Sequence, residues 1–352
     1  MRHVKTLFFF LFFTMPLCGC NDSAKPLDIG EVTDFARKLE TSVNKKDPSF
    51  FDDAIDKDEI SKRANMPDSR AASRIKLGSG IVSLLSSKGS FLLVKKYEKD
   101  GIWHLLFRLL VEDNMALNYY DFELKRRNAK VKIIDGYAYN LGQKFSEVLG
   151  DLNSQMNEIE RESRQDKDRW LDLIGVMRKK IMDSRFKEAY DMFQTIPPDV
   201  RKIKIMQIIH VTICAGISAE IQQAAFNEYK NLYPNEPNIA LLQMSSYLLQ
   251  QNYESALTAI DDLDKMINKD PLLDYHRSIC FKMLGKNEQQ KECLVRLVKN
   301  VPGFEDGLIE MIAVSIENEN KTEATKWIKE FRLHSAYDQD RLDAVLESYG
   351  WE

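Results

Sequence analysis

The feature of this sequence that most constrains its fold is a repeat with a period of 34 residues between positions 170 and 333. One position recurs as Gln222, Ala256, Gln290 and Ala324. Bulky residues follow each of these four and seven positions later, as Phe226 and Tyr229, Ile260 and Leu263, Leu294 and Leu297, and Ile328 and Phe331. Spacings of four and seven place side chains on one face of a helix. A fixed period of this length predicts stacked helix hairpins instead of a single globular core.

The sequence around the repeated position resembles the tetratricopeptide repeat family. Residues 186–189 (Phe-Lys-Glu-Ala) and 253–256 (Tyr-Glu-Ser-Ala) match that family's opening of the second helix, and Pro234 and Pro302 match its terminal proline. Some of the family's small positions are bulky or polar here, so the repeats are degenerate and a generic helical solenoid is the alternative. The resemblance implies antiparallel helix pairs over residues 170–334, with the first helices lining a concave groove.

The N-terminus predicts export and attachment to lipid. A basic start precedes an apolar run at 7–17, which has the length of a signal peptide and is too short to span a bilayer. The run ends in Leu17-Cys18-Gly19-Cys20, which resembles the lipobox of bacterial lipoproteins. The resemblance implies removal of residues 1–19 and lipidation of Cys20. We therefore expect a lipid anchor on the periplasmic side of a bacterial membrane, inner or outer, with an ordinary secretory peptide or an N-terminal membrane anchor as alternatives.

The groove positions of the tetratricopeptide family define a candidate binding surface. They map onto Lys204, Gln207, Val211, Asn238, Leu241, Ser245, Tyr275, Ile279, Lys282 and Ile309. The set contains apolar, polar and charged residues and lacks a repeated Lys or Arg clamp. For each single residue, ordinary packing of helix faces is an equally good explanation of its presence. As a set it predicts a groove for a peptide or protein. The expected function is a protein–protein interaction scaffold whose partner is another exported or envelope protein.

Residues 27–150 predict a small α+β domain. Apolar residues at helical spacing predict helices over 27–46 and 69–86. Further along, apolar runs separated by turns predict four strands in an antiparallel meander, and Asp100-Gly101 predicts a hairpin between the first two. Arg126-Arg127, in a later turn, are interpreted as residues that keep the turn soluble.

The order of these elements, and the closing phrase KVKIIDGYAYN, resemble the cone fold of the nuclear-transport-factor-two-like (SnoaL-like) superfamily. The resemblance implies a curved sheet around helices, often with a pocket in which some members hold an acid and a base. The polar candidates are His104, Tyr119, Tyr120 and Asp135, and strand alternation lets only one of the tyrosines point inward. No carboxylate pair is expected to titrate apart, so an enzyme is not expected. Small-molecule binding or isomerase-like activity in this domain, with the array as scaffold, is the alternative function.

Charge and cysteine content restrict the partners further. The net charge is −4 and is spread along the chain, so the basic field that nucleic acid binding requires is missing. Besides Cys18 and Cys20, the chain has Cys214, Cys280 and Cys293, which we interpret as buried apolar residues. Whether Cys280 and Cys293 pair stays open. No Cys or His pair has the spacing of a zinc site, and no cofactor is predicted.

The predicted fold class is an α+β N-terminal domain, made of helices and a four-stranded antiparallel meander, followed by an all-α solenoid of degenerate tetratricopeptide-like hairpins. The expected segments are 1–19 (signal peptide), 20–26 (lipidated tether), 27–150 (cone-like domain), 151–169 (charged linker or helix), 170–334 (helical repeat array) and 335–352 (capping helix).

Overall fold

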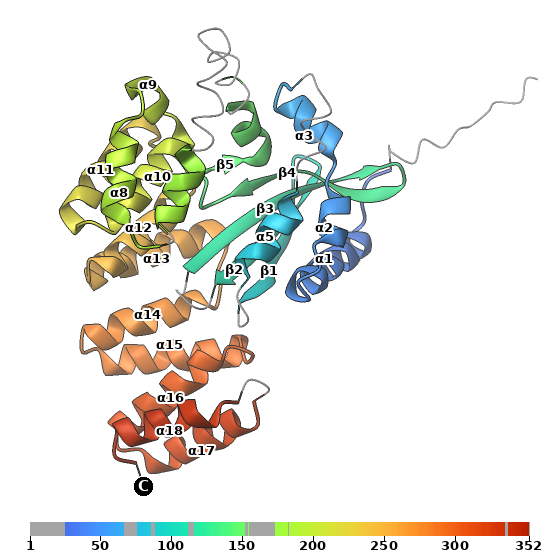
Figure 1. Ribbon diagram of the computed structural model, residues 1–352. Coiled ribbons are helices and arrows are strands. Elements are labelled where there is room, and N and C mark those ends of the chain that lie inside the picture. The colour runs from blue at the N-terminus through green and yellow to red at the C-terminus, as the bar shows by residue number, and fades with distance from the viewer. Residues whose placement is uncertain are drawn as a thin grey trace, which may run out of the picture.

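The computed structural model describes residues 25–66, 76–85, 89–111, 116–151, 154, 173–181, 183–334 and 337–351. The predicted signal peptide, the predicted lipidation site Cys20 and most of the predicted linker lie outside these residues. The described chain forms an α+β domain and a helical array, and one face of the sheet lies against the array (Figure 1). The predicted order, an α+β domain before an all-α array, is confirmed.

The labelled helices before the sheet are short apart from the first. They are α1 (Ile29–Asn44), α2 (Ser49–Ala54), α3 (Lys57–Arg63) and α5 (Leu77–Leu84). Helix α1 begins in a capping box, because Asp28 Oδ1 accepts from Glu31 N and the Glu31 carboxylate accepts from Asp28 N. Its buried residues recur at the predicted helical spacing. Helix α5 occupies only part of the predicted 69–86 helix, and residues 67–75 are not among those described.

The sheet is an antiparallel meander in the order β1-β2-β3-β4-β5. Its strands are β1 (Ser90–Lys99), β2 (Ile102–Val111), β3 (Ala116–Arg127), β4 (Lys130–Ala138) and β5 (Gln143–Lys144). The predicted Asp-Gly hairpin is confirmed, since Asp100 and Gly101 form a tight turn with φ of 53° and 73°. The prediction of four strands is one short. Strand β5 has two residues paired with the end of β4, which is too short to show alternation in a sequence.

The inner face of the sheet packs against α1, α2 and α5. Phe51 of α2 is fully buried in this cluster together with Phe91, Phe107 and Phe122 of the sheet. The rings of Phe91 and Phe107 stack at 4.5 Å between centroids, and those of Phe51 and Phe122 meet edge to face at 5.2 Å. This aromatic cluster is the core of the α+β domain.

The array consists of helices that pack as successive hairpins (Figure 1). They are α8 (Phe186–Gln194), α9 (Pro198–Arg201), α10 (Lys204–Ala215), α11 (Ala219–Leu232), α12 (Ile239–Leu249), α13 (Tyr253–Ile267), α14 (Leu273–Met283), α15 (Asn287–Asn300), α16 (Glu305–Glu317), α17 (Lys321–Arg332) and α18 (Gln339–Ser348), preceded by helical residues at 173–181. Helices α10 to α17 pair as α10/α11, α12/α13, α14/α15 and α16/α17.

The hairpins repeat with the predicted period. Their second helices begin 34 residues apart, at Ala219, Tyr253, Asn287 and Lys321. The four repeated positions of the sequence lie in the first turn of these helices, and none is more than 4% exposed. Ser218, Asn252 and Asn320 precede three of the helices, and each side chain accepts a backbone N–H of the first turn. The buried position therefore repeats in all four hairpins and the side-chain cap in three of them.

Helix α18 closes the array at its C-terminal end. Leu342 is fully buried and packs with Ile309 of α16. Arg341 forms ion pairs with Glu305 and Asp306, which lie in the first turn of α16. Carboxylates are favoured at that end of a helix by its dipole, and the arginine neutralises them where they are buried. Helix α18 thus covers the side of α16 that would otherwise stay open.

Candidate functional site

The predicted groove residues lie on the first helices of successive hairpins. Lys204, Gln207 and Val211 are on α10, Asn238 precedes α12, Leu241 and Ser245 are on α12, Tyr275, Ile279 and Lys282 are on α14, and Ile309 is on α16. The residues at the two ends of this set differ in exposure and in contacts. The residues of α10 and α12 contact other parts of the same chain, whereas those of α14 are half exposed.

The outer face of the sheet covers α12 and the start of α14. Leu106 of β2 and Tyr119 of β3 form one apolar cluster with Leu241 and Met244 of α12 and Leu273 of α14. Each of these side chains is at most 3% exposed. In this arrangement Leu241 contacts the chain's own sheet, so a ligand could reach it only if the sheet moved.

A buried polar contact joins the two parts of the chain beside this cluster. Arg108 of β2 forms an ion pair with Asp270, which lies in the α13–α14 loop, and Tyr119 Oη donates to Asp270 Oδ2 at 2.8 Å. Asp270 Oδ1 also accepts from Leu272 N at 3.0 Å, so the same carboxylate fixes the entry to α14. Arg108 and Asp270 are 4% and 2% exposed. Burial, followed by the charge of Asp270, raises the pKa of Tyr119 well above its usual value.

Lys204 of the predicted groove also reaches the α+β domain. Its Nζ donates to Glu236 Oε1 at 2.7 Å and to the carbonyl of Gly142 at 3.3 Å. Tyr137 Oη of β4 donates to Glu236 Oε2 at 3.4 Å. Gly142 has a φ of 61°, and a Cβ on it would lie 2.6 Å from Asn238 Nδ2. Glycine is therefore required where the end of the sheet meets the start of α12.

Three further groove residues serve contacts inside the array. Gln207 Nε2 donates to the carbonyl of Arg201 at 2.9 Å and to Glu228 Oε1 at 3.1 Å. Val211 is 2% exposed and belongs to the apolar cluster of the first hairpin. Ser245 Oγ donates to the carbonyl of Leu241 one turn earlier. The contacts of Gln207 and Val211 hold α10 against its neighbours, whereas that of Ser245 lies within α12.

The open part of the predicted groove lies on α14 and α16. Ile279 and Lys282 are half-buried, and Lys282 Nζ lies 3.2 Å from Glu310 and 3.9 Å from Glu317 of α16. Tyr275 packs edge to face on Phe304, with 5.0 Å between the ring centroids. Ile309 is buried beneath α18. The accessible remainder is a small surface with an aliphatic centre and charges of both signs.

A pocket of about 610 Å³ opens between α15 and α17, on the second helices of the last two hairpins. Val295 and Leu333 line it and are 43% and 75% exposed. Trp327 also lines it, and its Nε1 is buried without an acceptor among the described residues. Lys326 Nζ lies 4.4 Å from the Trp327 ring centroid. Sequence reasoning missed this pocket because it was directed at the first helices.

The polar residues expected inside the cone lie on different faces of the sheet. Tyr120 belongs to the aromatic core on the inner face, whereas Tyr119 faces the array, so the prediction that only one of them points inward is confirmed. His104 pairs with Glu123 across β2 and β3, and Glu123 pairs with Asp135 across β3 and β4. The contacts of His104 and Asp135 are with polar groups outside the aromatic core.

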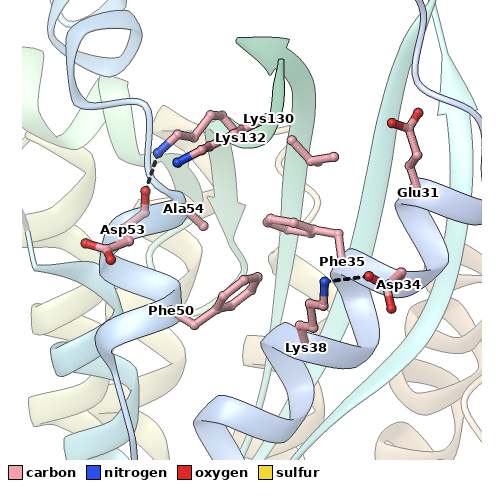
Figure 2. A pocket seen from close by; sticks show the side chains of 10 residues that line it. Glu31, Asp34, Phe35, Lys38, Phe50, Asp53, Ala54, Lys130 and Lys132 are labelled. Carbon is pink, nitrogen blue, oxygen red and sulfur yellow. Dashed lines mark hydrogen bonds and ion pairs between the residues drawn. The ribbon is translucent and has the colours of Figure 1, made fainter. Parts of the chain in front are cut away.

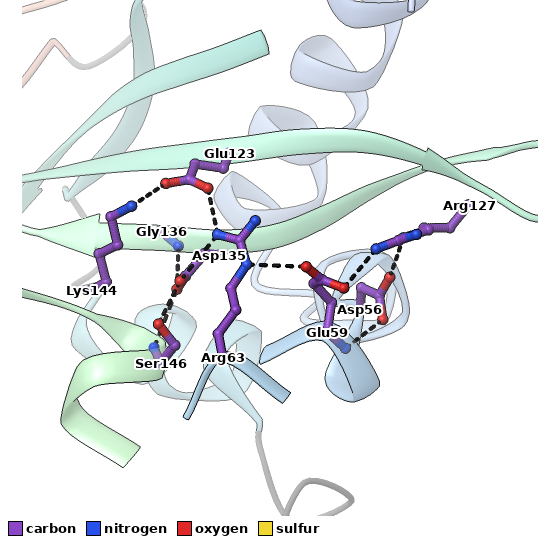
Figure 3. Close-up of polar contacts among 9 residues, drawn as sticks. All are labelled: Asp56, Glu59, Arg63, Glu123, Arg127, Asp135, Gly136, Lys144 and Ser146. Atoms are coloured by element: carbon purple, nitrogen blue, oxygen red, sulfur yellow. Dashed lines mark hydrogen bonds and ion pairs between the residues drawn. The ribbon is translucent and has the colours of Figure 1, made fainter. Parts of the chain in front are cut away.

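Asp135 belongs to a polar network that joins α3 to the sheet (Figure 3). Its carboxylate accepts from Ser146 Oγ at 2.6 Å and Gly136 N at 2.9 Å, while Arg63 Nη1 lies 3.4 Å away. Glu123 accepts from the same Arg63 nitrogen and from Lys144 Nζ, both at 2.6 Å. Burial alone would raise the pKa of Glu123, but the hydrogen bonds from Lys144 and Arg63 outweigh it and keep that pKa below its usual value. Cations and hydrogen-bond donors of the same chain thus occupy both carboxylates of this network.

His104 lies beside a second polar group on the sheet. Its Nδ1 is 3.2 Å from Asp121 Oδ1, and its ring stacks on that of Tyr97 with 4.8 Å between centroids. Tyr97 Oη donates to Asp121 Oδ2 at 2.5 Å. Burial, then this hydrogen bond, raises the pKa of Tyr97 above its usual value, so the phenol stays protonated. Neither of the two pockets described in this section is lined by Tyr97, His104 or Asp121.

A second pocket, of about 620 Å³, lies between α1, α2 and β4 (Figure 2). Phe35 and Phe50 face one another across it, with 5.5 Å between ring centroids. Lys132 Nζ donates to the carbonyl of Asp53 at its edge. The carboxylate of Asp53 and the ammonium of Lys130 have no ion pair among the described residues. The pocket combines an aromatic floor with charges of both signs.

The three described cysteines are free and buried. Burial raises the pKa of each of the Cys214, Cys280 and Cys293 thiols to about 11. Cys280 and Cys293 therefore form no disulfide in this structure. Among the described residues, no group of His, Cys, Asp or Glu side chains is placed to hold a metal ion.

Comparisons with known proteins add little to this geometry. No protein-family model matches the chain, and a comparison with curated proteins gives no match. A solved structure titled MamA MSR-1 C2 is 11% identical, with a TM-score of 0.37, and the match covers 51% of this chain and 98% of that chain. At that TM-score the likeness carries no argument. Within the part of the chain that the structure describes, no helix is long and apolar enough to cross a membrane.

Proposed function

We propose that this chain is a membrane-anchored bacterial envelope lipoprotein whose tetratricopeptide-like array binds another exported protein through its last two hairpins. The pocket between α15 and α17 is the observation that carries the binding surface. It presents two exposed aliphatic side chains, Val295 and Leu333, beside the Trp327 indole, whose N–H is buried and has no acceptor among the described residues. A peptide supplies apolar side chains, which suits the exposed aliphatic part of this lining.

The position of the sheet supports the same binding surface, because the sheet covers the first part of the groove that the sequence predicts. Leu241 and Lys204, the predicted groove residues of the first hairpins, already contact the α+β domain. A partner at that place would have to displace an apolar cluster and the buried Arg108–Asp270 pair. The second helices of the last two hairpins need no such rearrangement.

Site-specific photocrosslinking in intact cells tests the binding surface. A photoreactive phenylalanine analogue at Leu333 should crosslink to one exported protein, identified by mass spectrometry. The same analogue at Leu249, which is 66% exposed on α12, is the control for non-specific capture. Equal capture of the same proteins from both positions would contradict the proposal.

A pair of charge-introducing variants tests the same surface without a crosslinker. Val295→Asp with Leu333→Asp should abolish co-purification of the partner, because burying two carboxylates costs several kcal/mol. Leu249→Asp with Met266→Asp changes residues of similar exposure, 66% and 40%, outside the pocket. The matched pair should leave co-purification intact. These variants are preferable to deletion of 170–352, which would expose Leu106 and Tyr119 of the sheet.

The anchor has its own test. Cys20→Ser should release the protein from membranes, and the N-terminal peptide of the unaltered chain should carry the mass of its acyl groups. Several acyl chains together anchor stably, whereas one does so only marginally. Membrane association that persists in Cys20→Ser would contradict lipid anchoring. This result is independent of the binding surface on the array.

The pocket between α1, α2 and β4 favours a second candidate function, small-molecule binding by the cone-like domain, with the array as scaffold. Ala54 is 6% exposed and lines the pocket. Ala54→Trp should fill it without adding charge. Native mass spectrometry of the protein purified from cells should then show a bound small molecule that is lost in the variant. A spectrum with no bound mass in either protein would remove this candidate.

A further inference from the structure

The first described residues are fixed to the end of the sheet where β3 turns into β4. Arg126 Nε donates to the carbonyl of Lys25 at 3.1 Å, and its Nη2 forms an ion pair with Glu31 at 2.5 Å. Trp103 Nε1 donates to the carbonyl of Leu27 at 3.1 Å. Arg126 is 8% exposed, so the interpretation of this residue as a turn solubiliser is wrong. It holds the N-terminal segment against the sheet.

The β3–β4 hairpin at this end is basic and tightly turned. Residues 125–132 include five cations and no acid. Asn128 and Ala129 form the turn with φ of 47° and 61°, which is the geometry of a two-residue hairpin loop. The turn fixes the spacing of Arg127 and Lys130, which pair across the two strands.

The residues that the structure describes do not compensate all of this charge. Arg127 pairs with Asp56 and Glu59. Lys125 and Lys130 are exposed and have no ion pair among the described residues, and Lys132 donates to a neutral carbonyl. Within the described part of the chain, ammonium groups without an ion pair therefore remain on both strands of the hairpin.

An exposed apolar side chain lies at the same end. Ile29, in the first turn of α1, is 59% exposed and follows directly on the segment that Arg126 and Trp103 hold. Acids are also present nearby, since Glu98 lies near the end of β1 and Asp100 lies in the β1–β2 turn. These acids reduce the net attraction between this end of the molecule and an anionic surface. The attraction therefore depends on an orientation in which the lysines of the hairpin face that surface.

We propose that the β3–β4 hairpin, through Lys125, Lys130 and Lys132, contacts the anionic headgroups of the membrane, with Ile29 at the headgroup boundary. The inference rests on the proposed anchor at Cys20. Lys25 follows Cys20 by five residue steps, and an extended chain of that length spans at most about 18 Å. The hairpin is thus held close to the bilayer, where lysines supplement a lipid anchor.

This contact sets the orientation of the whole molecule. The hairpin lies at one end of the structure, and α17 and α18 lie at the opposite end (Figure 1). With the hairpin on the membrane, the last hairpins of the array point away from it. The pocket between α15 and α17 is then accessible to a second exported protein.

Vesicle flotation tests the contact without the lipid anchor. The probe is the chain from residue 20 onward with Cys20→Ser, mixed at low ionic strength with vesicles of phosphatidylglycerol and phosphatidylcholine or of phosphatidylcholine alone. Binding should require phosphatidylglycerol and weaken with salt. One lysine near an anionic surface is worth about fivefold in affinity, so Lys125→Glu with Lys130→Glu should lower binding by about 25-fold or more. Circular dichroism should show unchanged folding, because both side chains are exposed.

A matched pair controls for net charge. Lys187→Glu with Lys329→Glu makes the same charge change on exposed residues of α8 and α17 and should leave flotation unchanged. An equal loss in both pairs, binding to phosphatidylcholine alone, or no binding at low salt would overturn the proposal. Stronger inhibition of vesicle binding by inorganic phosphate than by chloride at equal ionic strength would also overturn it, because that result would indicate a site for free phosphate. None of these outcomes bears on acylation of Cys20, which the N-terminal peptide mass decides separately.

Discussion

The two faces of the sheet are both buried, but in different ways. The inner face meets α1, α2 and α5 through aromatic and aliphatic side chains. The outer face meets the array through an apolar cluster that borders the buried group of Arg108, Asp270 and Tyr119. Apolar contacts are tolerant of shifts, whereas a buried ion pair with shared hydrogen bonds is satisfied in one arrangement only. The outer face therefore has the contact that fixes the position of one domain on the other.

This difference changes the role of the array. An array with an open groove is a binding surface along its whole length, but here its first hairpins hold the sheet. The outer face would be exposed in an isolated α+β domain, with Leu106 and Tyr119 in water. The array is thus part of the fold of the N-terminal domain as well as the proposed binding element.

Removing Asp270 should be the most damaging test of the outer face. Asp270→Ala leaves Arg108 buried without its carboxylate and removes the acceptor of Leu272 N. Loss of one partner from a buried pair costs about 3–5 kcal/mol. Urea unfolding followed by circular dichroism should show this decrease in the free energy of unfolding. Asp262→Ala, in an exposed i,i+3 pair with Lys265, should change it by less than about 0.5 kcal/mol. A similar small change for Asp270→Ala would mean that the ion pair does not hold the domains together.

A glycine comparison should isolate the contact at the end of the sheet. Gly142 and Gly101 have φ of 61° and 73°, so alanine is strained at both. A Cβ on Gly101 meets nothing within 4 Å, whereas one on Gly142 would overlap the Asn238 side chain. Gly101→Ala should cost about 1–2 kcal/mol and Gly142→Ala about 1–3 kcal/mol more. Thermal unfolding of both variants measures the difference. Equal costs would show that the start of α12 moves away from residue 142 without loss of stability.

The sequence predicted the inner face and the repeats because both depend on local patterns. The 34-residue period is carried by residues such as Ala256 and Leu263, which are buried at every turn of the pattern. The Asp100-Gly101 turn and the alternation of its strands likewise lie within a few residues of one another. Patterns of this kind depend on no contact between distant segments.

The docking of the sheet on the array could not be predicted in the same way. Arg108 and Asp270 are 162 residues apart, and neither lies in a motif. One signal was present: β2 is apolar on both faces, with Leu105 and Leu106 buried on opposite sides. A continuous apolar run is typical of a strand that is covered twice. It indicates a second covering layer without saying which helices provide it. The sequence alone therefore predicts a ligand at the groove residues of α10 and α12, where the structure has the sheet.

Two adjacent tyrosines of β3 allow the two faces of the sheet to be compared, because one lies on each face. Tyr119 Oη donates to the Asp270 carboxylate on the outer face, whereas Tyr120 lies in the aromatic core of the inner face. Tyr119→Phe should cost about 1.5–3 kcal/mol, because a hydrogen bond to a buried charge is lost. Tyr120→Phe should cost about 1 kcal/mol or less. Urea unfolding of the two variants provides the comparison, and a larger cost for Tyr120→Phe would reverse the assignment of the polar contact to the outer face.

The smallest expected effect lies at the edge of the inner face, where Glu31 of α1 pairs with Arg126 of β3. The hydrogen bond from Arg126, then that from Asp28 N, lowers the pKa of Glu31 from 4.5 to about 2. A carboxyl whose pKa is lower in the folded state stabilises the fold above its unfolded pKa and loses that contribution as the pH falls through its folded pKa. The contribution of Glu31 should therefore be complete above a pH of about 4.5 and disappear toward 2. Since its side chain is 33% exposed, solvent screening limits the effect to about 1 kcal/mol or less.

In Glu31→Gln this part of the pH dependence should be missing, while exposed Glu98→Gln should keep it, as urea unfolding across that pH range would show. An unchanged pH profile in Glu31→Gln would mean that Arg126 is held in place by the backbone carbonyls of residues 25 and 26 alone.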